Sequence, residues 1–331
     1  DLIRDLFTET VEAKMTSDRK RFRPLGPYAA ILIPFEQDGR LDVDGLKKQI
    51  DFLVDSGISG IFPCGTSGEF VNLSIVENCE IMDVVSQGAS GRMDVLPGAC
   101  ASSIDGTLRL IKNAEKNNCP AVVVCPPYYY TLNQREVLSY YKEIIKKTDI
   151  NIILYNIPAF TNEISMDTFK ELIMEDKVVG IKDSSGNMKK IIHYVQAADE
   201  LRPDFAVMTG TDDILVPALI GGCTGSMTAL SGIIPEVTTQ IYRSFYERDF
   251  DKAVKLQKSI LRLLELAESI LFPAGYKLVM EERGFKMGHL KQVIPEMKNG
   301  EYLEIRKLIK NELTKILRDK VVPTCVQGGE R

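Results

Sequence analysis

Lys182 is the residue of this sequence best placed to carry out chemistry. It ends an apolar, strand-like run, Val178 to Lys182, and the loop residues Asp183-Ser184-Ser185-Gly186 follow it. Burial of an ammonium group is costly, so the pKa of a buried lysine falls, and the free amine that results can attack a carbonyl to form a Schiff base. Taken alone, the position also suits an ordinary solvated lysine after a short strand.

Hydroxyl and phenol groups follow two other strand-like runs. Gly65-Thr66-Ser67-Gly68 comes after the run Gly57 to Cys64. Its two hydroxyls and exposed backbone N–H groups suit a small carboxylate, although an ordinary glycine-rich turn has the same composition. Tyr155 ends the run Ile150 to Tyr155, where a phenol could carry protons to and from a substrate held by Lys182.

Three further segments offer polar contacts. The carboxylates of Thr209-Gly210-Thr211-Asp212-Asp213 could accept hydrogen bonds from substrate hydroxyls, or Thr211 or Asp212 could instead cap the next helix. Pro126-Pro127-Tyr128-Tyr129-Tyr130 presents phenols on a rigid turn, but tyrosine clusters more often pack at interfaces than move protons. Ser226, in the last strand-like run, is also assigned to substrate binding.

The elements that must position these residues alternate regularly. Eight short apolar runs are separated by amphipathic helical patterns; the runs are Ala29 to Pro34, Gly57 to Cys64, Val95 to Ala99, Ala121 to Cys125, Ile150 to Tyr155, Val178 to Lys182, Phe205 to Thr209 and Gly222 to Met227. Parallel strands buried on both faces have this continuous apolar character, so the pattern predicts an α/β fold, the TIM (β/α)8 barrel. A doubly wound sheet is the alternative, but no G-x-G-x-x-G fingerprint follows the first strand.

This reading divides the chain into three parts. Residues 28–248 form the barrel, in which reactive groups gather at the carboxyl ends of the strands. Residues 249–331 form a C-terminal helical extension, with helical patterns over Phe250 to Ala267, Pro273 to Glu282 and Gly300 to Leu317. Residues 1–27, with the basic run Arg19-Lys20-Arg21, form an N-terminal arm, either helical or a solvated tail.

Composition excludes several classes of function. The net charge of −5 leaves no basic surplus for nucleic acid, so a small-molecule partner is expected. His193 and His289 lie far apart in the chain, which argues against a metal site or a histidine-based triad. No apolar stretch approaches the roughly 20 residues of a membrane span. Seven cysteines without C-x-x-C spacing indicate reduced thiols and a cytoplasmic protein.

In combination, these motifs resemble one known family. The chain is similar, over roughly residues 28 to 300, to the dihydrodipicolinate synthase / N-acetylneuraminate lyase family of class I, pyruvate-dependent aldolases. The segments that carry the resemblance are Ile33-Pro34-Phe35 with Asp38-Gly39, Gly65-Thr66-Ser67-Gly68-Glu69, Tyr155-Asn156-Ile157-Pro158 and Gly180-Ile181-Lys182-Asp183.

The resemblance implies a mechanism that needs no cofactor. Lys182 condenses with the keto group of pyruvate or another 2-oxo acid, Tyr155 relays protons, and Thr66 with Ser67 holds the carboxylate, while the iminium accepts electrons as a C–C bond to an aldehyde is made or broken. Tyr129 matches a tyrosine that crosses a dimer interface into a neighbour's site. The family is commonly a tetramer built from two such dimers, so a homo-oligomer is expected.

The resemblance also bears on the substrate. The synthase branch carries an arginine two residues after the proline of the tyrosine segment, and Phe160 stands there in this chain, where no bidentate pair with a carboxylate can form. Together with Gly210, Asp212 and Asp213, which suit a polyhydroxylated substrate, this favours a sugar-acid aldolase or a sialic acid lyase. The Gly68-Glu69-Phe70 ending of the turn, with Tyr155-Asn156 before Ile157-Pro158, looks more like the 2-keto-3-deoxy-sugar-acid aldolases. The alternatives are a dihydrodipicolinate synthase, an N-acetylneuraminate lyase, a hydroxyproline-type relative, and a catalytically silent barrel that binds or regulates.

Overall fold

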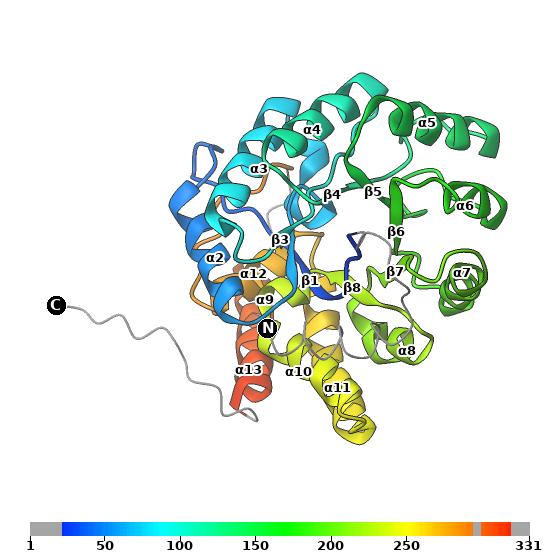
Figure 1. The fold of residues 1–331 in the computed structure, drawn as a ribbon. Helices are drawn as coiled ribbons and strands as arrows, with labels where there is room; N and C mark the ends of the chain where they lie inside the picture. Colours follow the sequence, from blue (N-terminus) through cyan, green and yellow to red (C-terminus); the bar gives the residue numbers. More distant parts are fainter. Residues whose placement is uncertain (1–21, 294–298, 319–331) are drawn as a thin grey trace.

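The computed structural model describes residues 22–293 and 299–318 of the 331-residue chain. Eight parallel strands form an inner wall and helices surround it, so the predicted (β/α)8 barrel is confirmed (Figure 1). The strands are β1 (Gly26–Ala30), β2 (Gly60–Phe62), β3 (Asp94–Val95), β4 (Ala121–Val124), β5 (Asn151–Asn156), β6 (Val178–Asp183), β7 (Ala206–Thr209) and β8 (Gly225–Thr228).

The helices between the strands form the outer layer. They are α2 (Val43–Asp55), α3 (Ile75–Ala89), α4 (Ile104–Lys116), α5 (Gln134–Lys147), α6 (Met166–Leu172), α7 (Met188–Leu201) and α8 (Leu215–Ile220), with short 3₁₀ helices η1 (Thr66–Gly68), η2 (Phe70–Asn72) and η3 (Asp212–Ile214). Side chains cap several of them; Ser74 and Glu77 form a capping box at the start of α3, as do Asn133 and Glu136 at the start of α5.

The strand order shows that the sheet closes on itself. The strands are hydrogen-bonded in the order β3-β2-β1-β8-β7-β6-β5-β4, and a parallel bridge between Gly98 and Val123 joins the two ends. A Cβ on residue 98 would lie 2.2 Å from the carbonyl oxygen of Cys64, so the close approach of this segment to the end of β2 requires a glycine. A doubly wound sheet, which would leave two open edges, is therefore excluded.

Several predicted strand boundaries are wrong although the strands exist. The first run was expected over Ala29 to Pro34, whereas β1 is Gly26–Ala30; Ile31 and Ile33 beyond it are nevertheless almost fully buried. The apolar run reflects burial, and burial continues past Ile31, whose amide makes the last backbone hydrogen bond from this strand to Phe62 of β2. Likewise β3 stops at Val95, shortly before Pro97, which has no N–H to donate.

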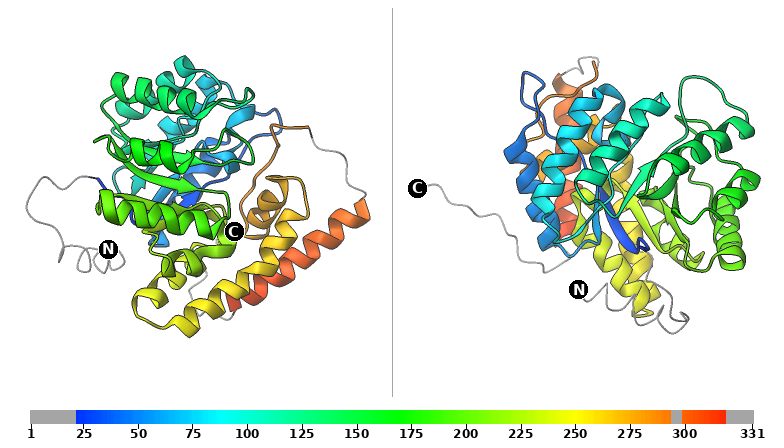
Figure 2. Two further views of the ribbon diagram at one scale, coloured as in Figure 1. Left: turned by 90° about the vertical axis from the view of Figure 1, so that its right-hand side faces the viewer. Right: turned by 45° about the horizontal axis from the view of Figure 1, so that its top comes forward.

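After β8 the chain becomes helical. The helices are α9 (Leu230–Ile233), α10 (Pro235–Tyr246), α11 (Phe250–Glu268), α12 (Ala274–Glu282) and α13 (Asn299–Arg318). The helices α11 and α13 run side by side in opposite directions and pack with α12 against one side of the barrel (Figure 2). Their apolar faces and α10 make a second core that includes Ile241, Ile260, Leu263 and Ile309.

Two sequence predictions fall partly outside this description. One is the C-terminal helical extension, residues 249–331, of which 294–298 and 319–331 lie outside the described residues; the other is the N-terminal arm. The expected N-terminal arm, residues 1–27, is described only from residue 22, and β1 already begins at Gly26. Within the part of the chain that the structure describes, no helix combines the length and apolar character that crossing a membrane requires.

Candidate active site

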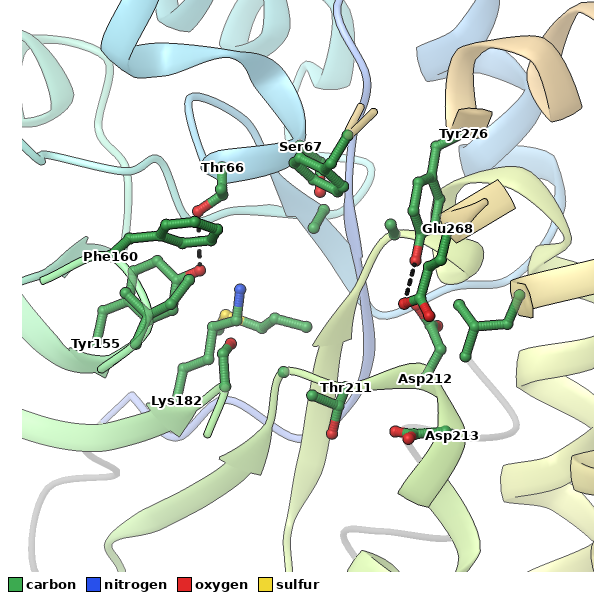
Figure 3. Close-up of a pocket in the computed structure, with 18 of the residues that line it drawn as sticks. Thr66, Ser67, Tyr155, Phe160, Lys182, Thr211, Asp212, Asp213, Glu268 and Tyr276 are labelled. Carbon is green, nitrogen blue, oxygen red and sulfur yellow. Dashed lines mark hydrogen bonds between the residues drawn. The ribbon is translucent and has the colours of Figure 1, made fainter. Parts of the chain in front are cut away.

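A cavity of about 660 Å³ opens at the carboxyl ends of the strands. It brings together eight of the residues singled out from the sequence: Thr66, Ser67, Tyr155, Phe160, Lys182, Gly210, Asp212 and Asp213. Figure 3 shows two sides to this space, with Lys182, Tyr155, Thr66 and Phe160 on one and Asp212, Glu268 and Tyr276 on the other.

Lys182 is buried and held between two aromatic rings. Its side chain comes from the end of β6, its residue is only 3% exposed, and its Nζ lies 4.4 Å from the ring centroid of Phe62 and 4.3 Å from that of Tyr155. Burial lowers the pKa of this amine to about 7, against smaller opposing effects of Cys100 and Asp212. A substantial fraction of Lys182 is therefore the free amine near neutral pH, the form that attacks carbonyls.

Tyr155 lies beside Lys182 on the neighbouring strand. The two residues are register partners of β5 and β6, and the Tyr155 Oη lies 3.1 Å from the Thr66 Oγ1. Burial raises the pKa of the phenol above its usual value, although hydrogen bonds with Thr66 and Ser184 oppose this. Tyr155 is therefore a protonated phenol at neutral pH, able to pass a proton along a hydroxyl chain that ends at Thr66.

The residues that follow this pair fasten the two strand ends together. Asn156 Nδ2 donates to Asp183 Oδ2 at 2.6 Å, and Asn156 Oδ1 accepts from the amide of Ile164 at 3.0 Å. The Ser185 amide donates to Asp183 Oδ1 at 3.0 Å. Each of these bonds involves Asn156 or Asp183, the residues directly after Tyr155 and Lys182, so the bonds restrict the separation and the orientation of the two reactive side chains.

Because Gly210 has no side chain, the side chain of Lys182 has room to lie beside it. A Cβ on this residue would be 1.9 Å from the Ser184 Oγ and 2.7 Å from the Lys182 Cε, distances that atoms in proteins do not adopt. The sequence placed Gly210 among the substrate-binding residues. The structure shows that residue 210 must also be a glycine for the side chains of Lys182 and Ser184 to keep their positions.

The turn that carries Thr66 and Ser67 is held by an ion pair. The turn ends at Glu69, which has a left-handed backbone (φ 58°), and the Glu69 carboxylate lies 2.6 Å from Lys277 Nζ of α12, with both side chains almost fully buried. The amide of Lys291 donates to the second oxygen at 2.8 Å. Burial lowers the pKa of Lys277 although Glu69 opposes this. The C-terminal extension therefore holds the turn in place.

The opposite side of the cavity is acidic. Asp212 is 5% exposed; its Oδ2 accepts from the Leu230 amide at 3.2 Å, and its carbonyl accepts from Gln257 Nε2 at 2.9 Å. Burial raises the pKa of Asp212 to about 6, with Thr228 and Leu230 opposing the rise. The neighbouring Asp213 lines the same side and is exposed.

Several lining residues were not found from the sequence. Glu268 ends α11, Tyr276 lies on α12, and the Tyr276 Oη donates to Glu268 Oε1 at 3.2 Å. Leu271 and Phe272 between them also line the cavity. The sequence marks these helices only as amphipathic, and nothing in that pattern tells which end reaches the barrel mouth.

Two predicted residues lie elsewhere. Ser226 does not line the cavity, because Met227 beside it does and successive side chains of a strand point to opposite faces; its hydroxyl lies next to Tyr242 of α10 instead. The Ser226 side chain therefore lies outside the cavity lining, and its assignment to substrate binding stays a prediction. Tyr129 is 89% exposed, has a left-handed backbone (φ 86°), and lines neither this cavity nor its neighbour.

A second, largely apolar cavity of about 440 Å³ adjoins the first. Phe70 and Tyr128 are among the residues that line only the second cavity. The two cavities share Thr66, Tyr155, Ile157, Phe160, Leu271 and Phe272. Among residues 22–293 and 299–318, no three His, Cys, Asp or Glu side chains are arranged to hold a metal ion.

Comparison with known proteins gives a consistent result. The model of the dihydrodipicolinate synthetase family matches residues 23–312. A 4-hydroxy-tetrahydrodipicolinate synthase of Methanosarcina mazei is 29% identical over 292 residues, 88% of this chain and 98% of the relative. A DapA-like lyase of Thermococcus onnurineus, described as uncharacterized, is 32% identical over 87% of this chain and 99% of its own length. The crystal structure of dihydrodipicolinate synthase from Aquifex aeolicus is 27% identical, with a TM-score of 0.81 over 87% of this chain and 98% of that one.

Proposed function

This chain belongs to the dihydrodipicolinate synthetase family and is a pyruvate-dependent class I aldolase, and we propose that it makes or cleaves the C–C bond of a 2-keto-3-deoxy sugar acid. Enzymes of this family work through a covalent Schiff base on their own lysine and need no cofactor. The observation that carries the proposal is the buried amine of Lys182, with a pKa of about 7, beside Tyr155.

In the proposed reaction, Lys182 Nζ attacks the keto carbon of pyruvate and the resulting carbinolamine loses water to form an iminium. Tyr155, hydrogen-bonded to Thr66, delivers and removes the protons that these steps require. The hydroxyl groups of Thr66 and Ser67 hold the carboxylate of pyruvate. In the cleavage direction, Lys182 forms the iminium with the keto carbon of the 2-keto-3-deoxy sugar acid. The C4 hydroxyl then loses its proton, the electron pair of the C3–C4 bond passes into the iminium to give the enamine of pyruvate, and the aldehyde leaves. The enamine takes a proton at C3, and water releases pyruvate from Lys182.

The aldehyde partner is inferred from the wall of the cavity. Phe160 lies at the position where the synthase branch of the family carries its arginine, and among the described residues that line the cavity Lys182 is the sole cation. An aldehyde with its own carboxylate, such as the second substrate of a synthase, would have no positive partner there. A sugar aldehyde needs none, because the hydroxyl of Thr211 and the carboxylates of Asp212 and Asp213 suit its hydroxyls.

Two other enzymatic functions have specific support. The named relatives at about 30% identity are 4-hydroxy-tetrahydrodipicolinate synthases, which favours that activity. An N-acetylneuraminate lyase would also suit an apolar residue at Phe160 and an acidic cavity wall. A silent binding protein is disfavoured, because Lys182 and Tyr155 are both present and adjacent.

We extend the proposal to assembly. Tyr129 and Tyr130 stand on the surface, 89% and 76% exposed, with their rings packed edge to face at 5.1 Å. We infer that this turn contacts a second copy of the chain and that Tyr129 acts in that copy's site, within a dimer of dimers. Sedimentation of the wild type and Tyr129→Ala tests the contact. We also propose a cytoplasmic location, because seven scattered cysteines without C-x-x-C spacing suit a reducing compartment.

The decisive experiment is reductive trapping. The protein is incubated with pyruvate and borohydride, and the intact mass and peptide masses are measured. A reduced pyruvate adduct on Lys182, absent in Lys182→Ala, supports the mechanism; folded wild-type protein that forms no adduct contradicts it. The second substrate is then identified by measuring turnover of pyruvate with aspartate semialdehyde, N-acetylmannosamine and glyceraldehyde. Fastest turnover with aspartate semialdehyde would overturn the sugar-acid proposal.

A further inference from the structure

We propose that Glu268 and Tyr276, two residues of the C-terminal extension, determine which aldehyde this enzyme accepts, by selecting an uncharged, polyhydroxylated one over an anionic one. The inference rests on the proposed function, because it concerns the second substrate of the same cavity. It adds residues from outside the barrel to those that the strand ends supply.

Glu268 and Tyr276 lie where the second substrate must pass. Both line the cavity, and Figure 3 shows them across the space from Lys182, next to Asp212. We call Asp212, Asp213, Glu268 and Tyr276 the distal wall. Pyruvate bound to Lys182 occupies the opposite side, so an aldehyde that approaches the iminium has the distal wall along its far end.

Charge carries the second step. The distal wall has three carboxylates. Lys182 is the one cation among the described lining residues; once it has formed the iminium, its positive charge is balanced by the carboxylate of the bound pyruvate. A phosphorylated or carboxylated aldehyde therefore meets like charges with no positive partner. Because Asp213 and Glu268 are exposed, solvent weakens this repulsion, and we expect a preference rather than an absolute exclusion.

Hydrogen bonding carries the third step. The Tyr276 ring is 5% exposed, and its hydroxyl donates to Glu268 Oε1 at 3.2 Å, which fixes the orientation of that carboxylate. The second oxygen of Glu268 and the lone pairs of the phenol stay available as acceptors. Asp212 beside them is held in place by the Leu230 amide, which donates to its Oδ2 at 3.2 Å. Carboxylate acceptors of this kind form charge-assisted hydrogen bonds with sugar hydroxyls.

The test compares aldehydes that differ in charge. The condensation of pyruvate with glyceraldehyde and erythrose, which are neutral, is measured against that with glyceraldehyde 3-phosphate and succinic semialdehyde, which are anionic. The readout is kcat/KM for each aldehyde in the wild type, Glu268→Gln and Tyr276→Phe. Glu265→Gln is the matched control, because Glu265 is three residues away on the same helix and pairs with Arg262 on the surface.

The wild type is expected to prefer the neutral aldehydes by about tenfold or more. Glu268→Gln, whose amide oxygen can still accept from Tyr276, should shift the neutral-to-anionic ratio by about three- to tenfold toward the anionic aldehydes, as expected for one partly screened charge. Tyr276→Phe should lower kcat/KM for the neutral aldehydes. The KM for pyruvate should stay the same in both variants, which a merely structural role would not predict.

Two outcomes overturn this inference while leaving the proposed function intact. One is a wild type that forms the Lys182 adduct and makes sugar acids but prefers glyceraldehyde 3-phosphate to glyceraldehyde. The other is a Glu268→Gln variant whose ratio equals that of Glu265→Gln. Absence of the pyruvate adduct is a separate result, and it refutes the proposed function itself.

Discussion

The titration of Lys182 gives the sharpest prediction for this enzyme. With the pKa lowered to about 7, half of the side chain is free amine at pH 7, whereas an unperturbed lysine of pKa 10.5 would be about one part in 3,000 free. Schiff-base formation at subsaturating pyruvate should therefore fall about fivefold between pH 7 and pH 6, and should gain less than about twofold above pH 7.

The assay is trapping with cyanoborohydride over pH 6 to 9, with the adduct on Lys182 quantified by peptide mass. Lys142, half exposed on the surface, serves as an internal control that should remain unmodified. A trapping rate that climbs tenfold per pH unit through pH 9 would refute the argument, because it would show that the amine titrates as an ordinary lysine.

The same pKa makes a prediction about stability. The unfolded chain keeps Lys182 protonated up to about pH 10.5, while the folded protein loses that proton near pH 7, so folding releases a proton between these values and stability from this group rises with pH. The cost of holding the amine in the fold is about 5 kcal/mol below pH 7 and vanishes above pH 10.5. Lys182→Met should therefore be more stable than the wild type.

The free energy of unfolding of Lys182→Met should exceed that of the wild type, and this difference should narrow by about 1.5 kcal/mol from pH 7 to pH 8.5. Urea unfolding at one protein concentration measures it. A gap that does not change with pH would mean that the stability difference comes from packing instead.

Three other substitutions test the rest of the site. Tyr155→Phe should slow turnover by about 10²- to 10⁴-fold if the phenol relays protons, and an unchanged rate would remove it from that role. Gly210→Ala places a Cβ 2.7 Å from the Lys182 Cε, so we expect at least about a tenfold loss of kcat in protein whose circular dichroism is unchanged. Glu69→Gln leaves Lys277 buried without its counter-charge, which should cost about 3 to 5 kcal/mol of stability and raise the KM for pyruvate; unfolding curves that superimpose on those of the wild type would show that the pair does not support the turn.

The barrel and the reactive pair could be predicted because both depend on local patterns. Strands buried on two faces have uninterrupted apolar residues, and a fold of eight βα units places the end of each strand at one mouth. This suffices to bring Lys182 and Tyr155 together, since adjacent parallel strands align their carboxyl ends. The apolar runs did not mark where a strand ends, as Ile31 and Ile33 show, because burial and ladder bonding stop at different residues.

The distal side of the cavity could not be predicted in the same way. Glu268 and Tyr276 line the cavity because α11 packs against η3 and α8, and α12 packs against α9. The direction of such packing depends on contacts between elements far apart in the sequence. Ser226 shows a complementary limit: the sequence identifies its strand-like run, but which residues of that run face the cavity depends on the register of β8 against its neighbours.

The ion pair between Glu69 and Lys277 constrains the order in which a new chain can complete its site. Lys182 and Tyr155 leave the ribosome well before Lys277 and Lys291, the two residues that satisfy the Glu69 carboxylate. A nascent barrel thus holds its reactive residues while the turn that carries Thr66 still lacks its counter-charge. For the same reason, a chimera that joins this barrel to the helices of a relative must preserve a cation at position 277, however well the two halves fold separately.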